Sequence, residues 1–156
     1  YKRDLRGMKL LEEEIIRFYL DANKIRENVL ELLKNAGSGH LGGSYSEAEI
    51  LAVLFNKFLK MDPSNPNWTE RDRFILSKGH AVPALYAVLN LIGKISSNEL
   101  NSLRKINSRL QGHPDRKLIK DIHAGTGALG QGISIAIGYA IAQKLQNEVF
   151  QLHFHV

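Results

Sequence analysis

Residues 74–80 of the 156-residue chain are Phe74-Ile75-Leu76-Ser77-Lys78-Gly79-His80. The apolar start of this stretch is typical of a short buried strand, and its glycine permits a tight turn. A helix is predicted directly after the turn, from about Val82 to Ile92. Helix, strand and helix in alternation indicate an α/β layer. Only this one strand is evident, so we predict an α/β fold with an incomplete parallel sheet.

A long helix is predicted before this strand, over Met8–Ala36. Apolar residues recur there at steps of three and four and so share one face, and Gly37 is typical of a helix end. The face consists of Leu11, Ile15, Phe18, Ala22, Ile25, Val29 and Leu32. Residues 38–45 are mostly small and predict a loop. Ser46 with Glu49 is a capping-box pair that predicts the start of the next helix.

Further helices are predicted after the strand. Ser96 with Glu99 forms a second capping pair, at the start of a short helix. A long polar loop follows from about Asn107 to Gly127, and the last helix covers about Leu129 to Leu145.

The two ends of the chain depart from this pattern. Met8 begins the helical periodicity, so residues 1–7 are interpreted as an upstream extension or a cloning scar. Residues 8–150 form the one predicted domain, which we expect to be partial. Residues 151–156 are interpreted as an atypical tail, where a cut or frame-shifted second core strand begins. An ordinary short terminal strand is the alternative.

Composition is that of a soluble globular protein. Hydrophobic residues make up 44% and charged residues 24% of the chain. No run of 18 apolar residues occurs, so no membrane span is predicted. The net charge is +5, but basic and acidic residues alternate without an arginine-rich run, which argues against nucleic-acid binding. The absence of cysteine excludes disulfides and thiolate chemistry and fits a cytoplasmic protein.

Three histidines lie in glycine-flanked turns: His40, His80 and His113. Imidazole donates, accepts and transfers protons near neutral pH, and neighbouring glycines let a backbone approach a ligand closely. Each histidine alone could be a surface or capping residue, but three in one context favour a shared site. A zinc site is the rival interpretation. Zinc ligands usually come at short paired spacings, however, and these three are widely separated.

A glycine loop is the other candidate, Gly125-Thr126-Gly127-Ala128-Leu129-Gly130-Gln131-Gly132. It contains a Gly-x-Gly-x-x-Gly pattern, which in dinucleotide folds follows a buried strand. The preceding residues 117–123 are polar and mixed, so a nucleotide site is not favoured. A loop that offers backbone groups to some ligand fits better. Tight helix packing through Gly130, Gly132 and Gly138 is the alternative.

Taken in order, four motifs resemble those of the transketolases. They are Ser38-Gly39-His40-Leu41-Gly42-Gly43-Ser44, Arg71-Asp72-Arg73-Phe74-Ile75-Leu76-Ser77-Lys78-Gly79-His80-Ala81, Gln111-Gly112-His113-Pro114 and Thr126-Gly127-Ala128-Leu129-Gly130-Gln131-Gly132. The similarity extends from about Leu10 to Leu145. The residues of the four motifs are most similar to those of the split form, in which the two halves of the enzyme are separate chains.

The resemblance implies a transferase of carbohydrate metabolism, in the pentose phosphate pathway. Such enzymes move a two-carbon ketol unit between sugar phosphates with thiamine diphosphate. His40 and His113 match the family's catalytic histidines, one in proton transfer and one at the donor sugar's hydroxyl groups. His80, Gly127 and Leu129 match positions that contact the cofactor. The implied fold class is α/β, the helix-rich amino-terminal portion of a thiamine diphosphate-binding fold.

The chain also departs from the family pattern. The family holds Mg or Ca through a Gly-Asp-Gly motif and a later asparagine, and no Gly-Asp-Gly occurs here. We therefore assign no metal ligand and expect the isolated chain to be inactive. Ala128 stands where many members have proline, which should not alter the backbone contacts.

Partners and alternatives follow from the same resemblance. The implied partners are sugar phosphates, a carboxy-terminal transketolase subunit, a second copy of the chain, or both chains together. The apolar helix over Leu129–Ala142 should be buried by such a partner. The alternatives are a related thiamine enzyme, similar to deoxyxylulose-phosphate synthase or dihydroxyacetone synthase, and a non-catalytic remnant or association module.

Overall fold

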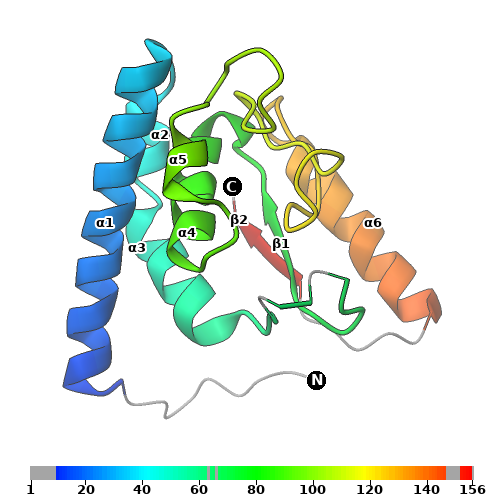
Figure 1. Cartoon of the computed structure of the whole chain (residues 1–156). Helices are drawn as coiled ribbons and strands as arrows, with labels where there is room; N and C mark the ends of the chain where they lie inside the picture. The colour runs from blue at the N-terminus through cyan, green and yellow to red at the C-terminus, as the bar shows by residue number, and fades with distance from the viewer. Residues whose placement is uncertain (1–9, 63, 66, 147–151, 156) are drawn as a thin grey trace.

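The computed structural model describes residues 10–62, 64–65, 67–146 and 152–155 (Figure 1). Residues 1–7, which were interpreted as an extension, lie outside the described residues. The helices and strands of the described structure are α1 (Glu12–Ala36), α2 (Leu41–Tyr45), α3 (Ala48–Val53), η1 (Leu54–Phe58), β1 (Arg73–Leu76), η2 (Gly79–Ala81), α4 (Val82–Leu91), α5 (Ser97–Leu100), α6 (Gln131–Gln146) and β2 (Leu152–His155).

A two-stranded parallel sheet lies at the centre of the described fold. β1 forms where the sequence predicts it, and β2 pairs beside it with Arg73 opposite Leu152 and Leu76 opposite His155. Residues 152–155, within the segment interpreted as a tail, form a strand in the same sheet as β1. Figure 1 shows α1 to α5 on one side of the sheet and α6 on the other, so the fold is an α/β layer as predicted.

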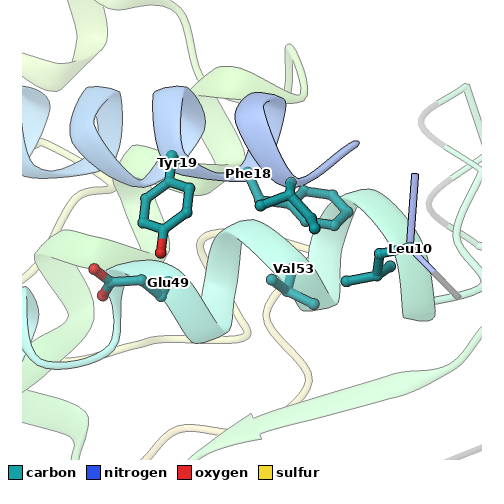
Figure 2. A pocket seen from close by; sticks show the side chains of 6 residues that line it. Leu10, Phe18, Tyr19, Glu49 and Val53 are labelled. Carbon is teal, nitrogen blue, oxygen red and sulfur yellow. The ribbon is translucent and has the colours of Figure 1, made fainter. Parts of the chain in front are cut away.

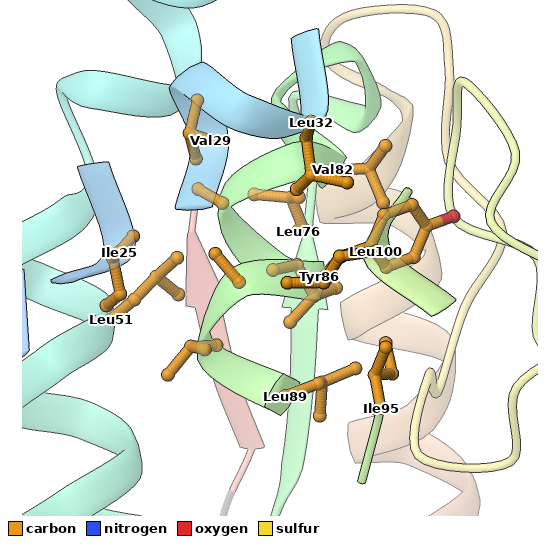
Figure 3. Packing of buried hydrophobic residues seen from close by; sticks show 14 of the residues in the cluster. Ile25, Val29, Leu32, Leu51, Leu76, Val82, Tyr86, Leu89, Ile95 and Leu100 are labelled. Carbon is orange, nitrogen blue, oxygen red and sulfur yellow. The ribbon is translucent and has the colours of Figure 1, made fainter. Parts of the chain in front are cut away.

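The main core surrounds α4, which lies between α1 and the sheet. Every residue from Val82 to Leu89 is buried, because α4 is covered on all sides. Figure 3 shows side chains of α1, α3 and β1 converging on it, including Ile25, Leu51 and Leu76. The thick apolar layer holds the strand end, and the turn that follows it, in a fixed position.

The predicted helix boundaries are partly confirmed. α1 ends at Gly37, which has a left-handed φ of 65°, and the Ser96 hydroxyl accepts a hydrogen bond from the Glu99 backbone at the start of α5. The predicted cap at Ser46 is wrong. α2 forms within the expected loop, and the Ser46 hydroxyl donates back to the Gly43 carbonyl, 3.0 Å away.

The apolar face of α1 is buried only from its second turn onward. Leu11 and Ile15 are 67% and 40% exposed, whereas Phe18 and the later members of the face are buried. The periodicity identified the correct face, but it could not show how far along α1 the covering elements extend.

Leu32→Ala should lower the free energy of unfolding by about 2–5 kcal/mol, because it leaves a cavity in the core. Leu30→Ala on the same helix is the matched control and should cost about 0.5 kcal/mol. Leu32 is 1% exposed and Leu30 53%. Denaturant unfolding of both variants measures the difference, and equal losses would contradict the assigned core.

Candidate functional site

The candidate site lies at the carboxyl end of β1, where segments distant in sequence touch. The Thr126 hydroxyl donates a hydrogen bond to the carbonyl of Leu76, the last residue of β1. A Cβ at Gly79 would lie 2.3 Å from the Thr126 carbonyl oxygen and 3.0 Å from the Gly127 nitrogen. No side chain fits at Gly79, so this glycine allows the turn after β1 to meet the glycine loop.

The glycine loop contacts the strand end at a second point. A Cβ at Gly132 would lie 2.6 Å from Oγ of Ser77, so α6 begins directly against the strand end. Cβ atoms at Gly130 and Gly138 would have no neighbour within 4 Å. Close helix packing, the alternative role for these three glycines, therefore holds for Gly132 alone. Gly130 instead has a φ of 85°, which favours glycine.

Two of the three histidines lie against each other. The rings of His40 and His80 meet edge to face, with 5.1 Å between their centroids. Gly43 leaves space for this arrangement, because a Cβ there would lie 3.0 Å from Nε2 of His80. The Ser44 hydroxyl donates to the Ala81 carbonyl at 3.4 Å and ties α2 to the turn.

The surroundings of His80 lower its pKa. Burial is the largest cause, because the charged imidazolium loses water, and repulsion from His40, Lys78 and His113 adds to it. The influence of His113 places the third histidine in the same cluster. His80 is therefore neutral near pH 7, with one ring nitrogen able to donate a hydrogen bond and the other able to accept one.

His113 lies beside Gly127 on the long loop. A Cβ at Gly127 would lie 3.8 Å from the Cδ2 ring carbon of His113. The buried Tyr86 of α4 donates to the carbonyls of Gln111 and His113, at 3.0 and 3.5 Å, and so anchors this loop on the core. The structure thus gathers the three histidines and Gly127. Leu129, two residues further along, is 69% exposed.

A family match accounts for this arrangement. Residues 19–154 match the family described as "Transketolase, thiamine diphosphate binding domain". The chain belongs to this transketolase family. The match confirms the resemblance that the four motifs indicated.

The similar proteins include a transketolase subunit and longer proteins named transketolase. The chain is 43% identical over 137 residues to the 6-deoxy-6-sulfo-D-fructose transketolase subunit of Clostridium sp. (strain MSTE9), covering 88% of this chain and 50% of that protein. It is 41% identical over 128 residues to the transketolase of Cereibacter sphaeroides, covering 81% and 20%.

Solved transketolases share the fold. The transketolase of Campylobacter jejuni subsp. jejuni NCTC 11168 superposes with a TM-score of 0.77 and 37% identity, over 90% of this chain and 21% of that one. The chain therefore spans about half the length of the Clostridium relative, and about a fifth of the other two proteins.

A buried contact between Glu47 and Lys78 lies beside the histidines, and the sequence did not predict it. Lys78 lies 3.5 Å from the Glu47 carboxylate and donates to the Ser46 hydroxyl at 3.0 Å. The Glu47 side chain is fully buried, and loss of water raises its pKa to about 8 although Lys78 opposes the shift. A signal was present, because Glu47 precedes the apolar Leu51 by four residues and so shares its helix face.

An apolar groove between α1 and α3 lies away from the histidine cluster. Figure 2 shows Tyr19 and Glu49 facing each other across it, with Leu10, Phe18 and Val53 further along. About 25 Å of helix α1 separates Tyr19 from the end that leads to His40, at 1.5 Å per residue. The groove therefore plays no part in the histidine cluster.

None of the helices that the structure describes is both long enough and apolar enough to cross a bilayer.

Glu47→Gln tests the buried carboxyl through the pH dependence of stability. Folding raises the pKa of Glu47 from 4.5 to about 8, so its stabilising contribution is present at low pH and is lost as pH rises through that range. Between pH 5 and 8 the wild type should lose on the order of 3 kcal/mol relative to the glutamine variant.

Glu49→Gln is the matched control, because hydrogen bonding to Arg26 lowers the pKa of this more exposed carboxyl. Its contribution is present above its ordinary pKa, so its curve should run parallel to that of the wild type from pH 5 to 8. Denaturant unfolding at each pH measures both differences. A parallel curve for Glu47→Gln would show that Glu47 is not buried in this way.

Proposed function

We propose that the chain forms part of a transketolase, which transfers a two-carbon ketol unit between sugar phosphates with thiamine diphosphate in the pentose phosphate pathway. The observation that carries the proposal is the gathering of His40, His80, His113 and Gly127 at the carboxyl end of β1. Ligands of open α/β sheets bind outside this end of the strands. The related proteins have transketolase names, and no observation favours the alternative enzymes or a non-catalytic remnant.

His40 and His113 are the proposed catalytic residues. His113 is exposed, and the backbone of its loop is anchored by Tyr86, so its ring can meet a substrate from a defined position. His40 is exposed beside His80. A neutral imidazole accepts a hydroxyl proton near pH 7, and His40 is proposed to move protons at the substrate while His113 contacts the donor sugar's hydroxyl groups.

The thiamine part of the cofactor suits the residues present. When bound, thiamine diphosphate supplies a thiazolium ring that stabilises the two-carbon fragment. Gly127 carries no side chain that would keep a flat ring from its backbone, and Leu129 offers an exposed apolar side chain. We therefore assign Gly127 to the aminopyrimidine, Leu129 to the thiazolium ring and the neutral His80 to the cofactor's vicinity.

The metal part of the site does not fit the described residues. Magnesium and calcium need several oxygen ligands, chiefly carboxylates and carbonyls. The part of the chain that the structure describes contains no group of three or more histidine and acidic side chains placed to hold an ion. The proposal is that another part of the parent enzyme holds the magnesium or calcium, and no step is assigned to it here.

A protein partner is part of the proposal, because α6 presents an apolar face to solvent. The exposed residues recur at steps of four and are between 51% and 78% exposed; they are Ile133, Ile137, Ile141 and Leu145. Large exposed apolar patches mark interaction surfaces. The proposed partner is a carboxy-terminal transketolase subunit, a second copy of this chain, or both, in a cytoplasmic oligomer.

Calorimetric titration of thiamine diphosphate with magnesium tests the cofactor assignment. We expect saturable binding when the chain is mixed with a matching carboxy-terminal subunit. Leu129→Ala should weaken it by roughly tenfold or more, since a leucine contact contributes about 1.5–3 kcal/mol. Leu30→Ala, at another exposed leucine on α1, is the control and should bind as the wild type does. No heat in the wild-type mixture would mean that the motifs hold no cofactor.

Turnover of xylulose 5-phosphate tests the reaction itself. The isolated chain should be inactive, and the parent enzyme, which carries the metal ligands, should be active. His40→Ala and His113→Ala should each lower turnover by about 10²–10⁴, the usual contribution of a proton-transfer group. Activity of the isolated chain would contradict the assignment of missing parts to a partner, and full activity of both variants would contradict the catalytic roles.

A further inference from the structure

A polar cavity lies at the opposite, amino-terminal end of β1. It is bounded by the start of β1, the loop before Ala124 and one face of α6. Its lining includes Arg71, Arg73, Arg116, Lys120, His123 and Tyr139. β1 advances by about 3.3 Å per residue, so the length of the strand separates this cavity from the histidine cluster. No proposed catalytic or cofactor residue lines it.

Arg71 supplies a buried donor that no described residue satisfies. Its residue is 8% exposed, and Nη2 donates to the Lys120 carbonyl at 3.1 Å. Nη1 makes no hydrogen bond within the described structure, because the nearest carboxylate, Asp121, lies 3.9 Å away. Asp121 is closer to Lys94, at 3.3 Å, and so is shared between two cations. Buried donors of this kind normally have an acceptor.

His123 supplies a second buried nitrogen without a partner. Its residue is 6% exposed, and Nδ1 lies 3.0 Å from the Phe74 backbone nitrogen and 3.2 Å from the Phe74 carbonyl oxygen. Nε2 has no partner among the described residues, whichever ring nitrogen carries the hydrogen. Tyr139 donates to the His123 carbonyl at 2.6 Å and fixes this segment to α6.

The field in the cavity is positive. Burial lowers the pKa of His123 to about 3, and repulsion from Arg71, Arg73 and Arg116 contributes to the shift. Three arginines and one lysine line the cavity, and no carboxylate stands among its described lining residues. A cavity lined by several cations, with a buried Arg71 nitrogen that makes no hydrogen bond within the described structure, is the complement of an anion.

We propose that this cavity binds a phosphate group, free or as a phosphomonoester. A phosphate has several acceptor oxygens and up to two charges, and guanidinium groups pair with it through two parallel hydrogen bonds. Nη1 of Arg71 and Nε2 of His123 meet it from the buried side, and Arg116 and Lys120 meet it from the exposed side. The assignment is independent of the proposed function, because it uses the other end of β1.

Titration with inorganic phosphate, at constant ionic strength set by chloride, tests the site. The chain should bind phosphate saturably, and the nitrogen signal of His123 Nε2 should shift along the same curve in NMR. Arg116→Gln with Lys120→Gln should weaken binding at least tenfold without touching the buried groups. Lys34→Gln with Lys105→Gln removes the same charge from exposed positions elsewhere and should change the affinity less than twofold.

Further titrations distinguish the possible ligands and locate the site. Tighter binding of glycerol 3-phosphate than of phosphate would identify an ester as the ligand, and equal or weaker binding would identify the free anion. His113→Ala should leave phosphate affinity unchanged, and a loss there would move the anion to the histidine cluster and overturn the proposal. Non-saturable shifts, equal losses in both double variants, or binding of a glutamate-rich peptide but not phosphate would also overturn it.

Discussion

The close contact between Gly79 and Thr126 is the constraint on which the rest of the site depends. A Cβ at Gly79 would lie within 2.3 Å of a backbone oxygen, so two backbones meet where most residues would keep them apart. This contact places the loop carrying His113 and the turn carrying His80 on the same end of β1. The hydrogen bond from Thr126 to Leu76 then holds the glycine loop against the strand. Without that approach His113 would not lie beside the pair of His40 and His80.

The core explains why this contact can be so close. α4 follows the turn directly and is buried from Val82 to Leu89, so the turn cannot recede from the glycine loop without moving a helix out of the core. Tyr86 adds a second link, because its buried ring carries a hydroxyl that bonds the backbone of the His113 loop. The apolar layer and the polar site are thus connected through one side chain that has an apolar body and a polar tip.

Features with a local physical cause could be predicted from the sequence. Gly37 ends α1 and Ser96 caps α5 because left-handed backbone and hydroxyl caps depend on neighbouring residues only. The site motifs were found because glycine beside histidine is visible in any short window. The pair of Glu47 and Lys78 was missed because it joins positions 31 residues apart, and the cap at Ser46 failed because α2 takes its hydroxyl. Pairing of β2 with β1 likewise depends on a contact across more than seventy residues.

The two ends of β1 differ in the number of cations that surround their carboxyl group. At the carboxyl end, Lys78 is paired with the buried Glu47, and burial rather than charge is the largest cause of the lowered pKa of His80. At the amino end, Asp121 must serve both Arg71 and Lys94, and further arginines remain around His123. The lowered pKa keeps His80 neutral near pH 7, beside the histidines proposed to act in proton transfer. A strong positive field is tolerable at the amino end because no proton transfer is assigned to that end. His123, with its pKa near 3, stays neutral there across the physiological range.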